Sequence, residues 1–486
     1  MSNQSLKSKA AKGMAWSAFG IFSTQSISFV IGIILARLLM PADYGLIGML
    51  AIFFAVSQLF IESGFSSALI QKIDRTETDY STIFYFNLLV STALYLILFF
   101  TAPLIAEFYN APELTLLTRV LSLNILISAL AIVQQARLKI LLDFKTPALI
   151  TLISVAISGS LGVVLAYSGY GVWALVVQSL CATAIRTLLF FFFNKWIPRL
   201  VFSISSLKQL FGYSSKLLAA GLVATIVNNL YSILIGKIFS SKDLGYYTRA
   251  KQFPELLSGT ITSILQGVTF PILASLQNER DRMVTVYGRL MRITVFFVIP
   301  TLTLFALLTE PFIRLFLTEK WMPVVPLIQW LCFARMITPV SVLNMNILNA
   351  IGRSDLFFKV DTSKLPLAII VMIITVPLGL KAVVIGHFGT TLVSFFINTY
   401  YPGKIFGYGA IRQIKEMKTV VIATLLMSVS VFSMIHFLPG DFSKLLAGSV
   451  LGIVTYLISA YFMKIEELSE VKKLAMQMME KIKVRN

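Results

Sequence analysis

The sequence is poor in charge. Asp, Glu, Lys and Arg together make up 13% of its 486 residues, and 57% of the residues are apolar. Soluble globular proteins carry roughly 25% charged residues. With so few charged side chains, a protein of this size cannot cover its surface for contact with water. The remaining apolar surface must therefore face lipid. The composition therefore predicts an integral membrane protein.

The residues on which metal sites, disulfides and nucleotide hydrolysis depend are also scarce. The two cysteines, Cys181 and Cys332, lie inside apolar runs, which argues against a disulfide framework. The two histidines, His387 and His436, are far apart, and no HExxH motif accompanies them. A phosphate-binding GxxxxGK[ST] loop is missing, and no nucleophile lies beside a poised base. We expect a protein that is not an enzyme and holds neither a metal nor a cofactor.

What the sequence has in quantity is long apolar runs. A helix needs about 20 apolar residues to cross the bilayer. No long polar loop separates the runs, which argues against a membrane glycan polymerase or ligase. Fourteen runs are of spanning length, at about 14–38, 45–70, 82–106, 114–136, 147–168, 171–194, 210–236, 246–274, 290–309, 324–349, 364–380, 382–401, 418–438 and 443–463.

The basic residues are unevenly shared between alternate loops. The formal net charge of +19 is dispersed along the chain rather than gathered on one face, which argues against nucleic acid. With the N-terminus inside, the inner segments hold 28 Lys and Arg and the outer loops hold seven. Because basic side chains collect on the cytoplasmic side, we expect both termini in the cytoplasm.

Two segments recur at similar offsets. Asp43-Tyr44-Gly45 returns as Asp243-Leu244-Gly245, an offset of 200, and residues 171–176 return as residues 379–384, an offset of 208. Such repeats are typical of transporters built from two halves. We interpret Asp43 and Asp243 as helix N-caps.

The repeat predicts the organisation of the chain. The fold class is an all-α polytopic membrane protein with about 14 transmembrane helices, in two six-span bundles related by a pseudo-two-fold plus two extra spans. The expected parts are an N-terminal bundle at 1–195, a C-terminal bundle at 196–403, two additional spans at 404–463 and an amphipathic helix on the cytoplasmic face at 464–486.

Ionisable side chains inside the spans are the informative positions, because each costs about 3 kcal/mol to insert. Arg335 is the deepest, and at helical spacing it shares a polar stripe with Asn346. One interpretation is a cavity cation that meets an anionic substrate. The other is an internal ion pair with Glu62 or Glu310.

Other charges in the spans also allow two interpretations. Arg119 and Arg186 lie near span ends, where they either face a cavity or extend to the membrane surface. Lys251 and Glu255 are four residues apart, so a pair within one helix is the simpler account, and a role in coupling or gating is the other.

Three stretches resemble a known family: residues 36–48 (ARLLMPADYGLIG), residues 244–254 (LGYYTRAKQFP) and residues 266–277 (QGVTFPILASLQ). They are similar to the polysaccharide transporter (Wzx-type) flippases of the multidrug/oligosaccharidyl-lipid/polysaccharide superfamily, and more closely to the colanic-acid and teichuronic-acid exporters. The resemblance covers essentially the whole chain. It implies a V-shaped pair of bundles around a cationic cavity.

The resemblance also implies a function. The expected cargo is an undecaprenyl-diphosphate-linked oligosaccharide, moved from the cytoplasmic to the outer leaflet of the bacterial inner membrane for surface polysaccharide synthesis. An H⁺ or Na⁺ gradient is the implied energy source, and a polysaccharide polymerase and chain-length proteins are the implied partners. The rival interpretations are a drug antiporter of the same superfamily, a lipid II flippase and, more remotely, the polymerase or ligase.

The site residues expected for this function come from the charged and polar positions in the spans, because the family has no short signature to transfer. Arginine and lysine suit a diphosphate, and amides suit sugar hydroxyls. The candidates are Arg335, Arg186, Arg119 and Lys216 for the diphosphate, Gln58, Asn228 and Asn346 for sugar contacts, and Glu62, Glu255 and Lys251 for coupling or gating.

Overall fold

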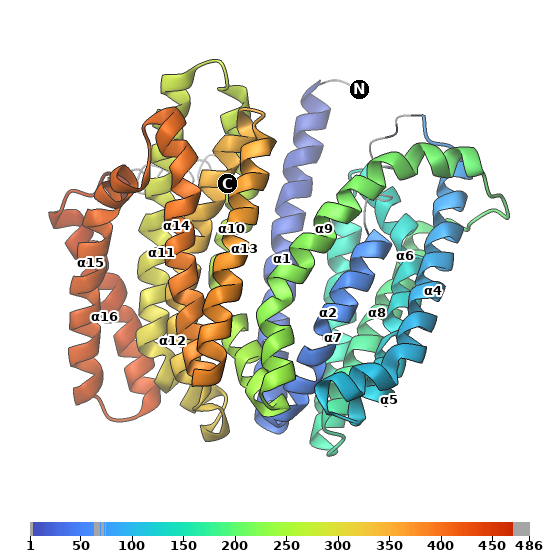
Figure 1. Cartoon of the computed structure of the whole chain (residues 1–486), viewed down its shortest axis with the longest axis horizontal. Coiled ribbons are helices and arrows are strands. Elements are labelled where there is room, and N and C mark those ends of the chain that lie inside the picture. The colour runs from blue at the N-terminus through green and yellow to red at the C-terminus, as the bar shows by residue number, and fades with distance from the viewer. Residues whose placement is uncertain (1–2, 63–68, 70–71, 73, 470–486) are drawn as a thin grey trace, which may run out of the picture. The chain divides into compact units, whose positions relative to one another are not determined.

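The computed structural model describes residues 3–62, 69, 72 and 74–469, and within these residues it contains helices and no strand (Figure 1). Twelve of the helices are long and apolar enough to cross a membrane. Helices α9 (Ile204–Ile238) and α10 (Ser241–Ser275) bring the long helices to fourteen. The predicted fold class, an all-α polytopic membrane protein, is confirmed.

The chain divides into two compact units, Met1–Gly245 and Tyr246–Asn486. The first unit contains α1 (Asn3–Leu38), α2 (Pro41–Glu62), α4 (Glu77–Tyr109), α5 (Glu113–Leu121), α6 (Leu123–Ile140), α7 (Lys145–Tyr167), α8 (Val172–Asn194) and α9. The second contains most of α10, then α11 (Arg280–Phe316), η1 (Glu319–Trp321), α12 (Val324–Ala350), α13 (Ser354–Thr375), η2 (Val376–Leu378), α14 (Leu380–Phe406), α15 (Ala410–Phe437) and α16 (Asp441–Phe462).

Helix α9 packs against α2 and α4 of the first unit, whereas the predicted division placed it in the second bundle. Hydrogen bonds hold the segment before α9 to the start of α4. The backbone N–H of Arg199 donates to Ser81 Oγ, and that of Ser203 donates to Thr82 Oγ1, both at 3.0 Å. Helix α9 therefore begins beside the N-terminal end of α4 and curves over the unit before it descends (Figure 1). The division at 195/196 stays a prediction.

The repeated aspartates act at helix starts, but one turn further in than an N-cap. Asp243 Oδ2 accepts hydrogen bonds from the backbone N–H and the hydroxyl of Ser240, and the Asp243 N–H donates to Ser240 Oγ at 3.1 Å. Asp43 Oδ2 accepts from the Met40 N–H at 2.8 Å. The N-cap positions are thus residues 40 and 240, and the carboxylates reach back to them, as in a capping box. The expectation that Asp43 and Asp243 are themselves N-caps is wrong.

The repeated glycines have a common cause. A Cβ on Gly45 would lie 1.6 Å from the carbonyl oxygen of Ser241, and one on Gly245 would lie 1.8 Å from that of Pro41. The first turns of α2 and α10 therefore cross with their backbones in direct contact, each glycine facing the carbonyl of the other helix. Any larger residue would force the two helix ends apart, as at other close helix crossings in membranes.

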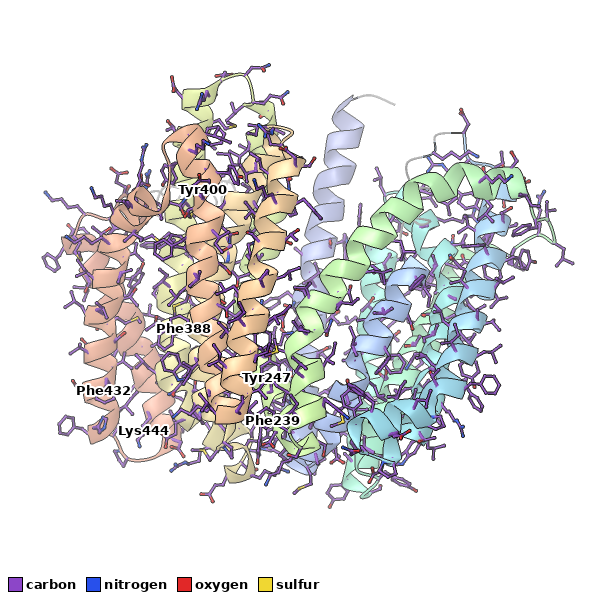
Figure 2. The ribbon with its side chains drawn as sticks, in the orientation of Figure 1. Phe239, Tyr247, Phe388, Tyr400, Phe432 and Lys444 are labelled. Atoms are coloured by element: carbon purple, nitrogen blue, oxygen red, sulfur yellow. The ribbon has the colours of Figure 1, made fainter. Side chains whose placement is uncertain are left out.

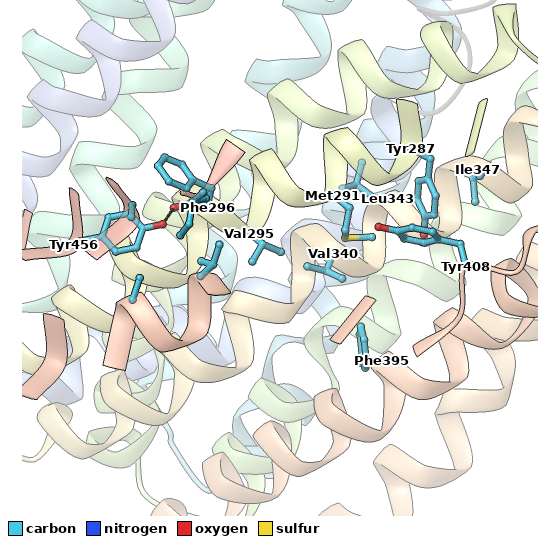
Figure 3. Packing of buried hydrophobic residues seen from close by; sticks show 14 of the residues in the cluster. Tyr287, Met291, Val295, Phe296, Val340, Leu343, Ile347, Phe395, Tyr408 and Tyr456 are labelled. Carbon is cyan, nitrogen blue, oxygen red and sulfur yellow. Dashed lines mark hydrogen bonds between the residues drawn. The ribbon is translucent and has the colours of Figure 1, made fainter. Parts of the chain in front are cut away.

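The core of the second unit joins α11, α12 and α14 to the last two spans (Figure 3). Tyr287 of α11 and Tyr408, which precedes α15, are almost fully buried and their ring centroids are 5.0 Å apart. Tyr456 of α16 donates to the Phe296 carbonyl of α11 at 2.8 Å. Spans α15 and α16 therefore share a core with the second unit.

The outward surface is apolar along the spans. Large apolar side chains project from the helices, as at Phe432 of α15, which is 57% exposed (Figure 2). Contiguous apolar surface of this kind is typical of a protein that contacts lipid.

Candidate functional site

Arg335 lies near the middle of α12, a helix whose other faces are largely buried. Pro339, four residues later, has no N–H to donate to the Arg335 carbonyl, so the helix ladder is broken at the arginine. Arg335 thus combines a charged side chain with a point at which its helix can bend.

The partner of Arg335 is Glu255 of α10. Arg335 Nη2 lies 3.3 Å from Glu255 Oε1, and the side chains are 23% and 52% exposed. The expected partner Glu310 instead pairs with Arg314 at 2.9 Å within α11. The ion-pair interpretation is therefore wrong for Glu310, whereas the side chain of Glu62 lies outside the described part of the structure. The pair that the structure contains joins α12 to α10 within the second unit.

Two further titratable side chains lie within electrostatic range of this pair. Lys251, one turn before Glu255, interacts electrostatically with both Glu255 and Arg335. His387 of α14 interacts electrostatically with Arg335 and Lys251. We call Arg335, Glu255, Lys251 and His387 the Arg335 centre, which contains two cations and one carboxylate. The sequence predicted an ion pair between Lys251 and Glu255 within α10, but the Glu255 carboxylate pairs with Arg335 of α12.

Aromatic side chains pack between α12 and α14. The ring of Phe388, next to His387, lies 5.5 Å from Trp330 and 6.1 Å from Phe333 (Figure 2). These rings join α12 to α14 within the second unit.

The polar stripe predicted on α12 lies on its partly exposed side. Most other positions in this half of the helix are buried. In the described part of the structure, the Asn346 Nδ2 atom is buried and has no hydrogen-bond partner. The partly exposed positions of the stripe are Arg335, Thr338, Val342, Asn346 and Asn349.

The first unit contains two further candidate arginines. Arg119, at the end of α5, donates from Nε to the Phe99 carbonyl at 3.2 Å, and its guanidinium lies 4.5 Å above the Phe99 ring. It is thus half-buried against α4, and its Nε serves the fold. Arg186 is half-buried on α8.

The remaining candidates belong to α2 and α9. Gln58 of α2 and Asn228 of α9 are exposed. The side chains of Glu62 and Lys216 lie outside the described part of the structure, so their roles stay predictions.

A buried polar network on α12 was missed by sequence reasoning. Asn344 Oδ1 accepts from the hydroxyl of Tyr287 at 2.5 Å and from Gln413 Nε2 at 2.8 Å, and Asn344 Nδ2 donates to the Val340 carbonyl at 2.9 Å. Tyr287, Asn344 and Gln413 are each 0% exposed. We call these three residues the Asn344 network, which ties α11, α12 and α15 together. Single polar residues 57 and 69 positions apart leave no periodic signal.

A second network holds the segment after α16. Arg292 of α11 contacts Glu467 at 2.8 Å and Glu416 of α15 at 3.3 Å. Glu416 also accepts a hydrogen bond from the hydroxyl of Tyr408. Burial, together with that hydrogen bond, raises the pKa of the Tyr408 hydroxyl, which lies in the turn between α14 and α15.

The chemistry that these groups support is binding. Among the described residues, no group of three His, Cys, Asp or Glu side chains could hold a metal ion. The Arg335 centre offers N–H donors and positive charge to an anion, with an internal carboxylate already in place.

Comparison with known proteins decides the family. The family model described as "Polysaccharide biosynthesis protein" matches residues 34–326, more than half of the chain. The chain belongs to this polysaccharide biosynthesis protein family. The resemblance drawn from the three sequence stretches is confirmed.

Curated relatives of this family member carry related names. The teichuronic acid biosynthesis protein TuaB of Bacillus subtilis strain 168 is 28% identical over 64% of this chain and 64% of its own length. The succinoglycan biosynthesis transport protein ExoT of Rhizobium meliloti is 25% identical over 71% and 70%, and the lipopolysaccharide biosynthesis protein WzxC of Escherichia coli K12 is 24% identical over 74% of each chain. The matched region thus spans about two thirds to three quarters of these relatives.

Solved structures show the fold. The lipid II flippase MurJ, in an inward closed conformation, superposes with a TM-score of 0.75 at 17% identity, covering 92% of this chain and 98% of MurJ. An inward-facing multidrug resistance MATE transporter of the MOP superfamily superposes with a TM-score of 0.62 at 17% identity, covering 80% and 96%. At this identity the likeness shows a shared fold only.

Proposed function

We propose that this family member moves undecaprenyl-diphosphate-linked oligosaccharide repeat units from the cytoplasmic to the outer leaflet of the membrane. The family, the names of the relatives and the fold shared with MurJ support the proposal. They agree on transport for polysaccharide synthesis and on a membrane scaffold, and they leave the cargo to be argued from this chain.

The observation that carries the proposal is the Arg335 centre. A half-buried guanidinium in a spanning helix is costly unless an anion compensates it. A diphosphate supplies that anion and can accept two N–H groups of the guanidinium at once. A cationic drug, the usual cargo of a multidrug antiporter, would be repelled by Arg335 and Lys251.

The rest of the site follows from this cargo. The diphosphate contacts Arg335 and Lys251, with Arg186, Arg119 and Lys216 as further cations along the route. Amides at Gln58, Asn228 and Asn346 contact sugar hydroxyls, while the prenyl chain stays in lipid. Glu255 and Glu62 act in coupling or gating.

Transport proceeds by alternating access and makes or breaks no covalent bond, so the protein acts as a carrier and not as an enzyme. Prolines next to the centre, Pro254 in α10 and Pro339 in α12, supply the points of bending. An H⁺ or Na⁺ gradient drives the cycle without a bound cofactor.

The cellular setting follows from the loop charges and the cargo. The protein lies in the bacterial cytoplasmic membrane with both termini in the cytoplasm, as the excess of basic residues in the inner segments favours. Its partners are the polysaccharide polymerase and chain-length proteins, which receive the repeat unit on the outer leaflet.

The experiment is a lipid extract from cells that lack this gene and keep the rest of the glycan pathway. We expect a complete repeat unit on undecaprenyl diphosphate to accumulate on the cytoplasmic leaflet, where an added membrane-impermeant glycosidase cannot reach it. Expression of the intact chain should clear the accumulation.

Each rival gives another result. Accumulation of lipid II would identify a lipid II flippase, and a change in drug sensitivity without any lipid accumulation would identify an efflux antiporter. A repeat unit that reaches the outer leaflet unpolymerised would place the protein after translocation. Any of these results contradicts the proposal.

A further inference from the structure

The ion pair between Arg335 and Glu255 is longer than the charge-assisted hydrogen bonds that Arg353 forms. It has an N–O separation of 3.3 Å, whereas Arg353 binds both oxygens of Asp355 at 2.8 and 2.7 Å. Charge-assisted hydrogen bonds are usually about 2.7–2.9 Å long. Arg335 thus holds Glu255 by less than the full fork of donors that a guanidinium offers.

The two partners are also unequally buried. The Arg335 side chain is 23% exposed, and that of Glu255 is 52% exposed. Arg335 is therefore the more buried partner of the pair, and Glu255 is the more exposed one. Glu255 can leave into a polar medium at little cost, but Arg335 cannot leave and needs an anion at all times.

The charges at the centre do not balance. Arg335 and Lys251 contribute two positive charges, and Glu255 compensates one of them. A diphosphate that joins a lipid to a sugar carries two ionised phosphates. It would neutralise both cations once Glu255 had moved away. A lipid with a single phosphodiester carries one negative charge and would only replace Glu255 charge for charge.

We propose that Glu255 is a resident counter-ion at the position that the cargo diphosphate takes on Arg335, and that this exchange selects diphosphate-linked lipids over lipids with one phosphate. The inference rests on the proposed function and adds a selectivity rule to it. Because Glu255 already supplies one negative charge to Arg335, a ligand must bring more than one negative charge to displace it. A diphosphate does so, and a single phosphodiester does not. The exchange also releases α10 from α12 at this point, so cargo arrival frees the helix that carries Pro254.

The test is binding to the purified full chain in nanodiscs of neutral lipid. The probes are farnesyl-diphospho-N-acetylglucosamine and its single-phosphate analogue, which differ by one phosphate group. The variants are E255Q, R335Q and the double variant. The matched control is E310Q, which removes the acid of the Arg314 pair elsewhere in the same unit. E255A serves as a second variant if E255Q does not fold.

We expect the wild type to bind the diphosphate probe at least about tenfold more tightly than the analogue. E255Q should tighten binding of the diphosphate probe by about two- to fivefold, the affinity equivalent of one partly exposed ion pair, and should make binding of the analogue measurable. The gain must vanish without Arg335, so the double variant should bind no tighter than R335Q. E310Q should bind as the wild type does.

Weaker or unchanged binding in E255Q, or a gain that persists in the double variant, would overturn the inference. So would a wild type that binds the two probes equally or binds neither. The proposed function is tested separately, because it depends on whether cells without the gene accumulate the repeat unit. If the repeat unit accumulates and E255Q binds the probes as the wild type does, the proposed flippase function stands and only the counter-ion role of Glu255 is contradicted.

Discussion

Helix α12 carries two polar centres that differ in how they are satisfied. In the Asn344 network, Asn344 is 0% exposed and its amide has partners on both its oxygen and its nitrogen, from three helices. At the Arg335 centre, the arginine is 23% exposed and has one ion-pair contact at 3.3 Å. The two centres lie nine residues apart on the same helix, so their difference comes from their partners.

The comparison teaches how to separate structural from functional polarity in a membrane protein. A buried polar group that has all its partners has nothing left to offer a ligand, and removing it strands the partners. A charged group with incomplete compensation has donors to spare and a reason to bind. We therefore expect substitutions at the two centres to affect different quantities.

The largest expected effect is on transport. Arg335→Gln keeps the polar volume but removes the charge, and we expect loss of repeat-unit export by about tenfold or more, because no other cation replaces it on α12. Stability should fall by less than about 1 kcal/mol, since the pair lost is partly exposed. Complementation of the deletion strain measures export, and a thermal melt of the purified protein measures stability. Normal export by a well-expressed R335Q protein would contradict a role in binding.

The next effect is on stability. Asn344→Leu fills the same space but removes the acceptor of the Tyr287 hydroxyl and one of the partners of the Gln413 amide, which still donates to the Tyr408 carbonyl. We expect this to cost about 2 kcal/mol. We expect a lower melting temperature and less protein in the membrane, with export per folded molecule nearly normal. If N344L folded as well as the wild type and failed to export, the roles assigned to the two centres would have to be exchanged.

Much of the fold could be predicted from hydropathy, and the errors in the predicted helix boundaries have one physical cause. The apolar runs locate α1, which ends at Leu38 as predicted, and α8, which runs from Val172 to Asn194. Helices that continue beyond the hydrocarbon were shortened. The eleventh span was expected from residue 364, whereas α13 begins at Ser354. Hydropathy reports the lipid-facing part of a helix, and polar residues such as Asp361 can continue the helix into the interface.

The candidate site could be predicted only in part. Helical periodicity placed Arg335 and Asn346 on one partly exposed face of α12, and the structure has them there. The partner acid could not be found, because Glu255 is 80 residues away and only the packing of α10 within the second unit brings it to Arg335. The sequence offers several acids at membrane depth and no rule that chooses among them.

The Asn344 network escaped prediction for a related reason. Asn344 is two positions from Asn346, so the two amides point to different sides of the helix. Periodicity favoured the one that shares a face with Arg335. The other is defined by Tyr287 and Gln413, which come from distant helices and have no sequence signature of their own.

Arg292 is an intermediate case that sharpens the comparison. It is a charge, like Arg335, but it has ion-pair partners on two elements, Glu467 at 2.8 Å and Glu416 at 3.3 Å. If the partners of a polar group decide its role, Arg292→Gln should lower stability and leave export per folded molecule nearly normal, as N344L does. The loss of stability should be about 1 kcal/mol, because the arginine is 32% exposed. Proteolysis at the segment after α16 should become faster, while probe binding stays normal. A loss of probe binding would show that the charge of a residue, and not how completely it is paired within the protein, decides whether it serves transport.

The smallest effect is expected at Arg314, which supplies the limit of the comparison. Its pair with Glu310 has good geometry, at 2.9 Å, yet the side chains are 44% and 56% exposed and lie on one helix. Water replaces such a partner readily, so Arg314→Gln should change stability by no more than about 0.5 kcal/mol and leave export unchanged. A thermal melt and the same complementation assay measure both. A large loss of export in R314Q would mean that charge anywhere on the second unit serves transport. The partial burial of Arg335 and its pair with Glu255 would then not explain its role.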